Sequence, residues 1–234
     1  FANTTAGNII SNPNFTNTGG SELVINGDFL SATSWNVNSN WNVNTVLGVA
    51  EADGTSDLNL NQNVWLPVIG KSYKVTFEVV SRSQGEVLFK LGGVFGQAHT
   101  TLGIKTEYIV ATSTDRFNID SQSSFVGSVT DVSVKELGAD WNILADTCTF
   151  GENGLTMTTT EGLDTKIVTS TDPLADSTSY KVTYTIHAVG LTGTNTIQYY
   201  TGSGALSYQD LPEQGVGTHT FYYTTPSTTL TGCY

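Results

Sequence analysis

The chain has 234 residues, a formal net charge of −12 and an isoelectric point of about 4.4. Its nine Lys and Arg residues are spread along the sequence, whereas binding a phosphate backbone needs clustered cations. The composition therefore excludes nucleic acid and anionic membrane surfaces as partners. No apolar run approaches the roughly 18 residues of a membrane span, so we expect no membrane insertion.

Charged residues make up 13% of the chain, against roughly 25% in an average soluble protein. The polar surface must come from Asn, Thr, Ser and Gly, which are poor helix formers, while Thr, Val and Tyr favour strands. This composition favours an extracellular or virion β protein. The chain begins at Phe1 and not at Met, so we expect either a removed leader, which implies export, or a fragment.

Two early stretches share one pattern, "NIISNPNFT" at 8–16 and "LVINGDFLS" at 23–31. Each has an apolar pair, then Asn-x-Asn or Asn-x-Asp, then Phe. We interpret 1–21 as an N-terminal extension that carries a second copy of the element opening the first module. The extension also holds two Asn-x-Thr sequons, Asn3 and Asn14, which are glycosylation candidates if the chain passes through a glycosylating pathway.

A strand repeats later in the chain. "SYKVTF" at 72–77 returns as "SYKVTY" at 179–184, and both alternate Tyr, Val and Phe or Tyr on one face, as a half-buried strand does. We align two further pairs of segments, Thr106–Thr114 with His219–Ser227 and Trp41–Val43 with Trp141–Ile143. Short strands between turns, without helical periodicity, predict an all-β fold of two tandem antiparallel β-sandwich modules at 22–137 and 138–234.

The first module carries a family resemblance through an ordered set of segments: "ELVINGDFLSATSWNV", "NQNVWLPVIGKSYKVTFEVV", "EYIVAT" and "SSFVGSVTDVSVKEL". These segments resemble the carbohydrate-binding-module-like jelly-roll domains of bacteriophage tail-fibre and other virion structural proteins. The resemblance covers about 115 residues of module one, and module two matches only through its middle. It implies jelly-roll or Ig-like sandwiches on an external assembly, often facing a glycan.

The two modules differ at their ends. Module one has a lead strand at Leu23–Phe29 and a final strand at Val126–Leu137, which the resemblance places near each other. Module two has neither, so we predict missing edge strands and an exposed groove. Our hypothesis is donor-strand exchange: residues 1–16 of one subunit insert into module two of another, with Ile9 or Ile10 and Phe15 filling the groove.

Such a head-to-tail contact makes filaments. Two alternatives stay open. Module two is completed by its own chain or by a longer one, or the extension is a disordered tail in which Pro13 limits pairing.

Nothing in the sequence has the pattern of a catalytic site. The three His residues stand alone, and the carboxylates at 51, 53 and 57 and at 161 and 164 lie in Gly-containing turns. We therefore expect no enzyme and no required cofactor. Structural calcium is the exception that the resemblance raises, because Asp131 matches the family's acidic position and Asp28 lies in the lead motif. Leu30 departs from the family's acidic residue there, so a hydrogen-bonded turn is the favoured role of Asp131.

Aromatic side chains are the candidates for stacking on a sugar. Trp35, Trp41 and Trp141 recur at module starts and are predicted core residues. If Val64 and Leu66 face inward, alternation turns Trp65 outward, as a glycan platform or a subunit contact.

The two cysteines, Cys148 and Cys233, are predicted to form a disulfide, with two buried free thiols as the alternative. The bond would close a loop of about 85 residues and contribute about 4 kcal/mol.

The sequence thus predicts a non-enzymatic structural subunit of an extracellular, pilus-like or phage-virion fibre, which forms a homopolymer. The alternative function is a glycan-binding pair of adhesion modules. A third, weaker interpretation is an accessory domain of a longer hydrolase.

Overall fold

A computed structural model describes residues 20–139, 141–143, 148–152, 154–158, 167–169, 177–189, 196–200 and 208–225. Every regular element in these ranges is a β-strand, which confirms the predicted all-β class. The chain divides into two compact units. The N-terminal unit includes residues 20–139 and 149–156, and the other described residues belong to the C-terminal unit. The module boundary at 137/138 stays a prediction, because the segment 149–156 follows it but belongs to the N-terminal unit.

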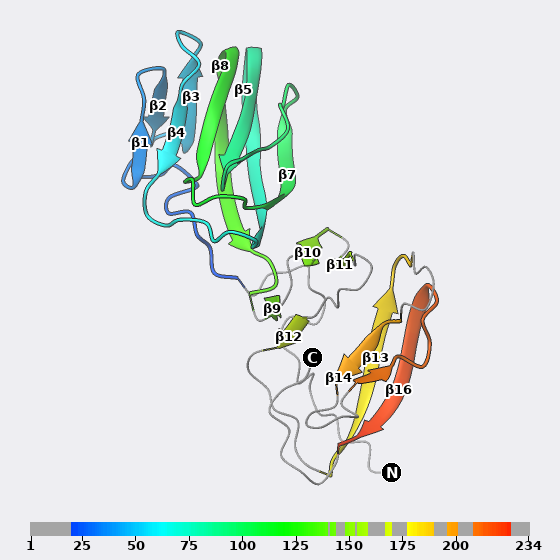
Figure 1. The fold of residues 1–234 in the computed structure, drawn as a ribbon. Coiled ribbons are helices and arrows are strands. Elements are labelled where there is room, and N and C mark those ends of the chain that lie inside the picture. Colours follow the sequence, from blue (N-terminus) through cyan, green and yellow to red (C-terminus); the bar gives the residue numbers. More distant parts are fainter. Residues whose placement is uncertain are drawn as a thin grey trace. The chain divides into compact units, whose positions relative to one another are not determined.

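One eight-stranded antiparallel sheet forms the N-terminal unit (Figure 1). Its strands are β1 (Trp35–Val37), β2 (Trp41–Asn44), β3 (Val49–Asp53), β4 (Asn59–Gln62), β5 (Ser72–Leu91), β6 (Val94–Phe95), β7 (Gly103–Val110) and β8 (Asn118–Glu136). The long strands β5 and β8 pair with each other along most of their length. On its other edge β8 pairs first with β4 and then with β3, while β5 pairs first with β7 and then with β6.

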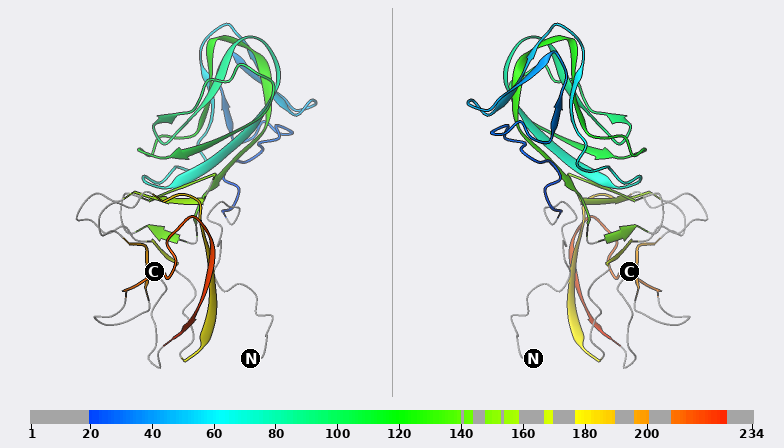
Figure 2. Two further views of the ribbon diagram at one scale, coloured as in Figure 1. Left: turned by 90° about the vertical axis from the view of Figure 1, so that its right-hand side faces the viewer. Right: turned by 90° about the vertical axis from the view of Figure 1, so that its left-hand side faces the viewer.

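The two long strands bend, so the single sheet becomes two layers. Their ladder shifts register four times between Thr76 and Glu86, and Gly85, Ser123 and Ser124 have positive φ angles. One layer has the order β2-β3-β8-β5-β7 and the other β1-β4-β8-β5-β6. Figure 2 shows β5 and β8 curving over from one layer into the other, in a nearly closed sandwich. The predicted β-sandwich is confirmed for this unit.

The core lies between the layers. Tyr73, Val75 and Phe77 of the repeated strand are 1%, 0% and 1% exposed, as their alternation predicted. Phe77 meets Phe89, from the other half of β5, at a ring-centroid distance of 4.3 Å, so one strand contributes to both layers. Burying a side chain of this size contributes about 2 to 3 kcal/mol. Trp35 and Trp41 are buried in the same core, as predicted.

The lead segment at 23–29 is not the strand that the sequence predicted. A single bridge between Glu22 and Lys135 precedes the segment, which then turns, because Asn26 and Phe29 have positive φ angles. The turn is closed by a hydrogen bond from Phe29 N to Asn26 O at 3.1 Å, and the Phe29 side chain is completely buried. The expected proximity to the final strand is confirmed: Leu23 N donates to Val134 O at 3.0 Å.

The described strands of the C-terminal unit form antiparallel pairs (Figure 1). These are β9 (Trp141–Ile143) with β12 (Ile167–Thr169), β13 (Ser179–Ile186) with β16 (Gly217–Thr224), and β14 (Gln198–Tyr200) with β15 (Tyr208–Asp210). A further hairpin, β10 (Cys148–Gly151) with β11 (Gly154–Met157), belongs mostly to the N-terminal unit. There Phe150 N donates to the Ser72 hydroxyl at 3.1 Å.

The ladders support the internal repeat and shift its alignment. In the N-terminal unit Thr76 pairs with Thr106, and in the C-terminal unit its counterpart Thr183 pairs with Thr220. The counterpart of Thr106 is therefore Thr220, one residue beyond the His219 that the sequence alignment gave.

The first strand pair repeats as well. Trp35 pairs with Gln62, and Trp141 pairs with Thr169, which follows Gln62 by the same 107 positions that separate the two "SYKVT" strands. Trp141 thus corresponds to Trp35, and not to Trp41 as the sequence alignment had it.

Candidate functional site

The two copies of the repeated strand differ in how many neighbours they have. The first half of β5 pairs with β7 on one edge and with β8 on the other. Within the described ranges, β13 pairs with β16 only. The strand missing from this part of the chain is the counterpart of the second half of β8. An edge without a partner presents backbone N–H and C=O groups to an added strand.

The inner faces of the two hairpins also differ in burial. The inward side chains of β13, Val182 and Tyr184, are half-buried, where their counterparts Val75 and Phe77 are at most 1% exposed. Aromatic rings from three strands gather on this face: Tyr184 lies 5.4 Å from His219, and Tyr199 of β14 lies 5.0 Å from Phe221 (centroid distances). Burial raises the pKa of Tyr199. The hairpin has an apolar face that the described residues cover only in part.

The outer face of the same hairpin is polar and satisfied. Three cross-strand hydroxyl pairs line it, with oxygen–oxygen distances of 2.8 to 3.1 Å: Ser179–Thr224, Thr183–Thr220 and Thr185–Thr218. Such pairs each stabilise a ladder by a few tenths of a kcal/mol to about 1 kcal/mol. The same face carries Lys181 and the exposed Tyr222 as a cross-strand pair, so its groups are polar at least in part. The edge of β13 and the apolar inner face are therefore the favoured places for an added partner.

The N-terminal unit shows how a lead segment is held in this fold. The Glu22 carboxylate accepts hydrogen bonds from Val134 N (2.9 Å) and the Ser133 hydroxyl (2.6 Å) on β8. The buried Gln62 amide accepts from Ile25 N at 3.1 Å and donates to Ile25 O at 2.5 Å, so it acts as a backbone partner would.

Trp35 also holds the lead segment in place. Its indole N–H donates to Asn26 O at 2.9 Å, and its ring lies 4.9 Å from the Phe29 ring. Sequence reasoning did not identify Glu22 or Gln62, because a contact across 112 or 37 positions leaves no local pattern.

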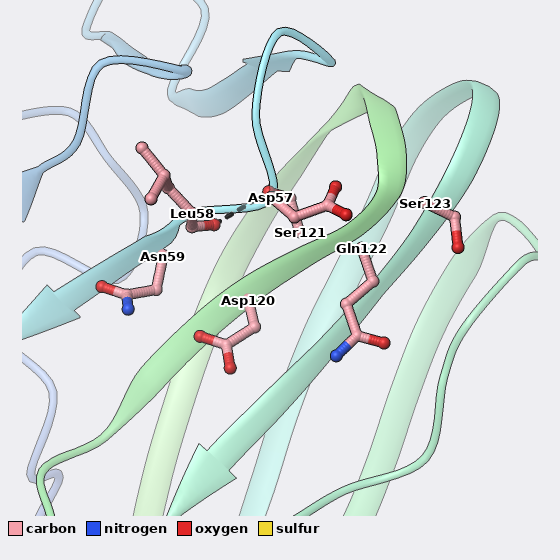
Figure 3. Close-up of a pocket in the computed structure, with 7 residues that line it drawn as sticks. All are labelled: Asp57, Leu58, Asn59, Asp120, Ser121, Gln122 and Ser123. Carbon is pink, nitrogen blue, oxygen red and sulfur yellow. Dashed lines mark hydrogen bonds between the residues drawn. The ribbon is translucent and has the colours of Figure 1, made fainter.

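A polar pocket of about 320 Å³ opens on the outer face of the β1-β4-β8-β5-β6 layer (Figure 3). Its lining residues are Asp57, Leu58, Asn59, Asp120, Ser121, Gln122 and Ser123. Figure 3 shows the side chains of Asn59, Asp120 and Gln122 pointing to the same side of the sheet. Oδ1 of Asp120 is buried and has no hydrogen-bond partner. Burial raises the pKa of this carboxyl, and the charge of Lys90 opposes that rise.

An amide network borders the pocket. Asn61 Nδ2 donates to Asn59 Oδ1 at 2.8 Å, and Asn36 Nδ2 donates to Asn61 Oδ1 at 3.0 Å. Asn61 pairs with Asn118, Asn118 with Lys90, and Lys90 with Phe95 at the opposite edge of the sheet. Phe95 is 59% exposed. This face offers amide donors and acceptors, a carboxylate and one exposed ring. Asp120 had no sequence signal, because only the β4–β8 register brings it beside Asn59.

Trp65 does not lie where the sequence predicted. Val64 and Leu66 are exposed, while Trp65 packs against the core, with its ring 5.9 Å from Tyr73. The prediction is wrong because this segment lies outside the strands, so strand alternation does not apply to it. The Trp65 indole N–H is buried without a hydrogen-bond partner, while the side chain as a whole is half-buried. Its role as a sugar platform stays a prediction.

The two candidate calcium ligands lie near the same backbone contact. Asp28 Oδ1 accepts from Leu30 N at 3.2 Å, and Asp131 has a positive φ angle beside the bond from Val132 N to Gly27 O. The described ranges contain no group of three or more His, Cys, Asp or Glu that could hold a metal. The calcium site stays a prediction.

One histidine has a partner that the sequence did not reveal. His99 Nε2 lies 2.6 Å from Glu107 Oε1, and both side chains are largely buried.

The "EADGTSD" turn, residues 51–57, is held by short-range hydrogen bonds, because the Asp53 carboxylate accepts from Thr55 N and from the Thr55 hydroxyl. These bonds lower the pKa of the exposed Asp53 carboxyl.

Several predicted site residues lie outside the described residues: Ile9, Ile10, Phe15, Asn3, Asn14 and Cys233. Cys148 is buried and forms no disulfide within the described part of the chain. Burial raises the pKa of its thiol to about 11. Its pairing with Cys233 stays a prediction. The third module-start tryptophan, Trp141, is 7% exposed, as the core prediction required.

Comparison with known proteins gives no match to a family model or to a curated protein. The likeness to tail-fibre domains therefore rests on the segments quoted above. No helix in the described ranges is long and apolar enough to cross a membrane.

Proposed function

We propose that this protein is a non-enzymatic structural subunit of an extracellular or virion filament. Its N-terminal extension inserts beside β13 in the C-terminal unit of a neighbouring subunit. The observation that carries the proposal is the contrast between the two copies of one strand: β5 has a partner on both edges, and β13 has one partner among the described residues.

The half-buried inner face of the same hairpin supports the proposal. Val182 and Tyr184 point to this face, which in the N-terminal unit is closed by the other layer. An inserted segment with apolar side chains at alternate positions would cover it, as in other cases of β-augmentation. The extension supplies Ile9, Ile10 and Phe15. Insertion between identical subunits is heterologous, so it propagates and does not close.

Electron microscopy tests the proposal with three variants. We expect filaments from the full chain and none from a chain lacking residues 1–16. Val182→Asp places a charge on the inner face of β13 and should also prevent filaments. The matched control Thr183→Asp places the same charge one residue away on the exposed outer face, so it should leave them intact. Filaments from the truncated chain, or equal effects of the two aspartates, would refute strand insertion.

A second candidate function is glycan binding, and the polar pocket is the observation that favours it. Carboxylate and amide groups at Asn59, Asp120 and Gln122 suit sugar hydroxyls, and a volume near 320 Å³ lies at the lower end of ligand sites. A glycan array with the full chain tests this function. The control is Asp115→Ala, because the Asp115 carboxylate pairs with Lys90 at 3.3 Å and does not line the pocket. Binding that Asp120→Ala abolishes and Asp115→Ala leaves unchanged would support glycan binding, and an array without selective binding would exclude it.

A further inference from the structure

The polar pocket on the outer face of the β1-β4-β8-β5-β6 layer is lined by negative charge and by no cation (Figure 3). Asp57 and Asp120 are its carboxylates, and the other lining residues are uncharged. Glu86 adds a third carboxylate next to the lining, because it is the cross-strand partner of Gln122. A ligand that carries a phosphate or a carboxylate would be repelled here. The charge of the pocket favours a neutral or a cationic ligand.

Asp120 is the carboxylate that its neighbours leave uncompensated. Its Oδ1 atom is buried and accepts no hydrogen bond from the described residues. Its cross-strand neighbour on β5 is Leu88, an apolar side chain that is 5% exposed, so that strand offers no donor. Asp57 differs, because its Oδ1 accepts from Ser124 N at 2.8 Å. An unpaired, partly buried carboxylate destabilises the folded chain, and a cation bound beside it would remove that penalty.

Lys90 on the same face does not fill this role alone. Its charge acts on Asp120, since it opposes the rise in the pKa of that carboxyl. Its Nζ atom, however, lies 3.3 Å from Asp115 Oδ2 and 5.4 Å from the centroid of the Phe95 ring. The Lys90 ammonium is thus held by groups that do not line the pocket. A cation that pairs with Asp120 inside the pocket has to come from a ligand.

We propose that this pocket takes a sugar with a free amine, whose ammonium group pairs with the Asp120 carboxylate. The hydroxyls of the same sugar ring bond to the side-chain amides of Asn59 and Gln122, which point to the same side of the sheet as Asp120 (Figure 3). This inference rests on the second candidate function, glycan binding, and names the class of sugar.

The walls of the pocket favour an amino sugar over the other common cations. A lysine side chain of a peptide brings an apolar stem, which needs apolar walls. Leu58 is the one apolar residue of the lining, and it is itself 38% exposed. A metal ion is disfavoured too, because the described ranges contain no group of three or more His, Cys, Asp or Glu that could hold one. Amide and hydroxyl groups suit the hydroxyls that surround the amine of a sugar.

A pair of oligosaccharides that differ in one chemical group tests the proposal. A glucosamine trisaccharide and its N-acetylated form are titrated into the full chain by calorimetry, at a pH where the free amine is protonated. We expect the amine form to bind, and acetylation, which removes the charge, to weaken binding about tenfold or more. In NMR spectra the amine form should shift the backbone amides of 57–59 and 120–123.

Two variants that each remove one negative charge without changing side-chain shape separate the site from general attraction to a chain of net charge −12. Asp120→Asn should weaken binding of the amine form about tenfold or more. Asp131→Asn is the matched control, because Asp131 does not line the pocket and Asn tolerates its positive φ angle. It should leave binding unchanged.

The outcomes that overturn the proposal differ from those that refute glycan binding. Equal weakening by the two variants would show general charge attraction and overturn the assigned role of Asp120. Equal binding of both trisaccharides at the pocket amides would overturn the amine preference and leave glycan binding standing. A lysine tripeptide that binds as tightly as the amine form would overturn the assignment to a sugar. If neither these trisaccharides nor any glycan on the array binds, the second candidate function itself is refuted.

Discussion

The hairpins β5–β7 and β13–β16 begin from nearly the same six residues and reach different environments. In the N-terminal unit, β5 pairs with β7 on one edge and with β8 on the other, and the opposite layer of the sandwich covers its inner face. Among the described residues of the C-terminal unit, β13 pairs with β16 alone, and the inward side chains of β13 are only half-buried. The motif "SYKVT" therefore specifies a strand and its inward face. Segments far away in sequence decide whether that strand has a partner on both edges and a covered inner face.

The largest expected difference comes from truncating the same inward position in each hairpin. Phe77→Ala should lower the free energy of unfolding of the N-terminal unit by about 3 to 5 kcal/mol, because it leaves a cavity beside Phe89. Tyr184→Ala should cost about 1 kcal/mol in the subunit, because the ring is half-buried. Denaturant unfolding followed by hydrogen exchange of each hairpin checks this. Equal losses would mean that the two inner faces are equally covered.

The next effect concerns the lead segment of the N-terminal unit, which has no counterpart within the described residues of the C-terminal unit. Gly27→Ala should cost about 1 to 3 kcal/mol, because the new methyl group displaces the turn from Val132. Amides of 22–29 should then exchange faster with solvent. Gly151→Ala is the control, since a Cβ there meets nothing within 4 Å. Unchanged exchange in the Gly27 variant would contradict the close packing of this turn against the Val132 backbone.

Sequence reasoning succeeded where the physical cause is local. The alternation of Tyr73, Val75 and Phe77 fixed a strand and its buried face, because strand geometry has a period of two. It failed at Trp65, since alternation was extended into a segment that is not a strand. It also could not find Asp120 or Gln62, whose surroundings depend on the pairing of distant strands and on the bend in β5 and β8.

A smaller effect with a defined pH dependence is expected at Asp120. Burial raises its folded-state pKa above the ordinary 3.8, so the folded protein binds this proton more tightly than the unfolded chain. Stability is therefore lost as pH rises from about 3.8 through the raised value. Asp120→Asn should raise the melting temperature at neutral pH and have no such effect in acid.

Asp53 provides the opposite case as a control. Hydrogen bonds from Thr55 lower its pKa, so its contribution is present at neutral pH and is lost as pH falls. Asp53→Asn should lower the melting temperature slightly at neutral pH. Melting curves of both variants from acid to neutral pH check the signs. A parallel response of the two variants would contradict the assigned causes.

The smallest effect is chemical and concerns Cys148. A buried thiol with a pKa of about 11 should react with a maleimide far more slowly than an unfolded control at pH 7. Intact mass before and after reduction of the denatured chain tests the predicted bond to Cys233 in the same sample. Rapid labelling of the native chain would show that Cys148 is accessible, against its 3% exposure.

The central claim is that β13 offers an edge to an N-terminal extension, and hydrogen exchange of its backbone amides tests this most directly. Amides of 181–186 are followed in the chain lacking residues 1–16, before and after adding a peptide of residues 8–16. The account predicts fast exchange that the peptide slows, while amides of 74–79, on the paired β5, stay slow throughout. Slow exchange of β13 without the peptide, or no response to it, would contradict the account.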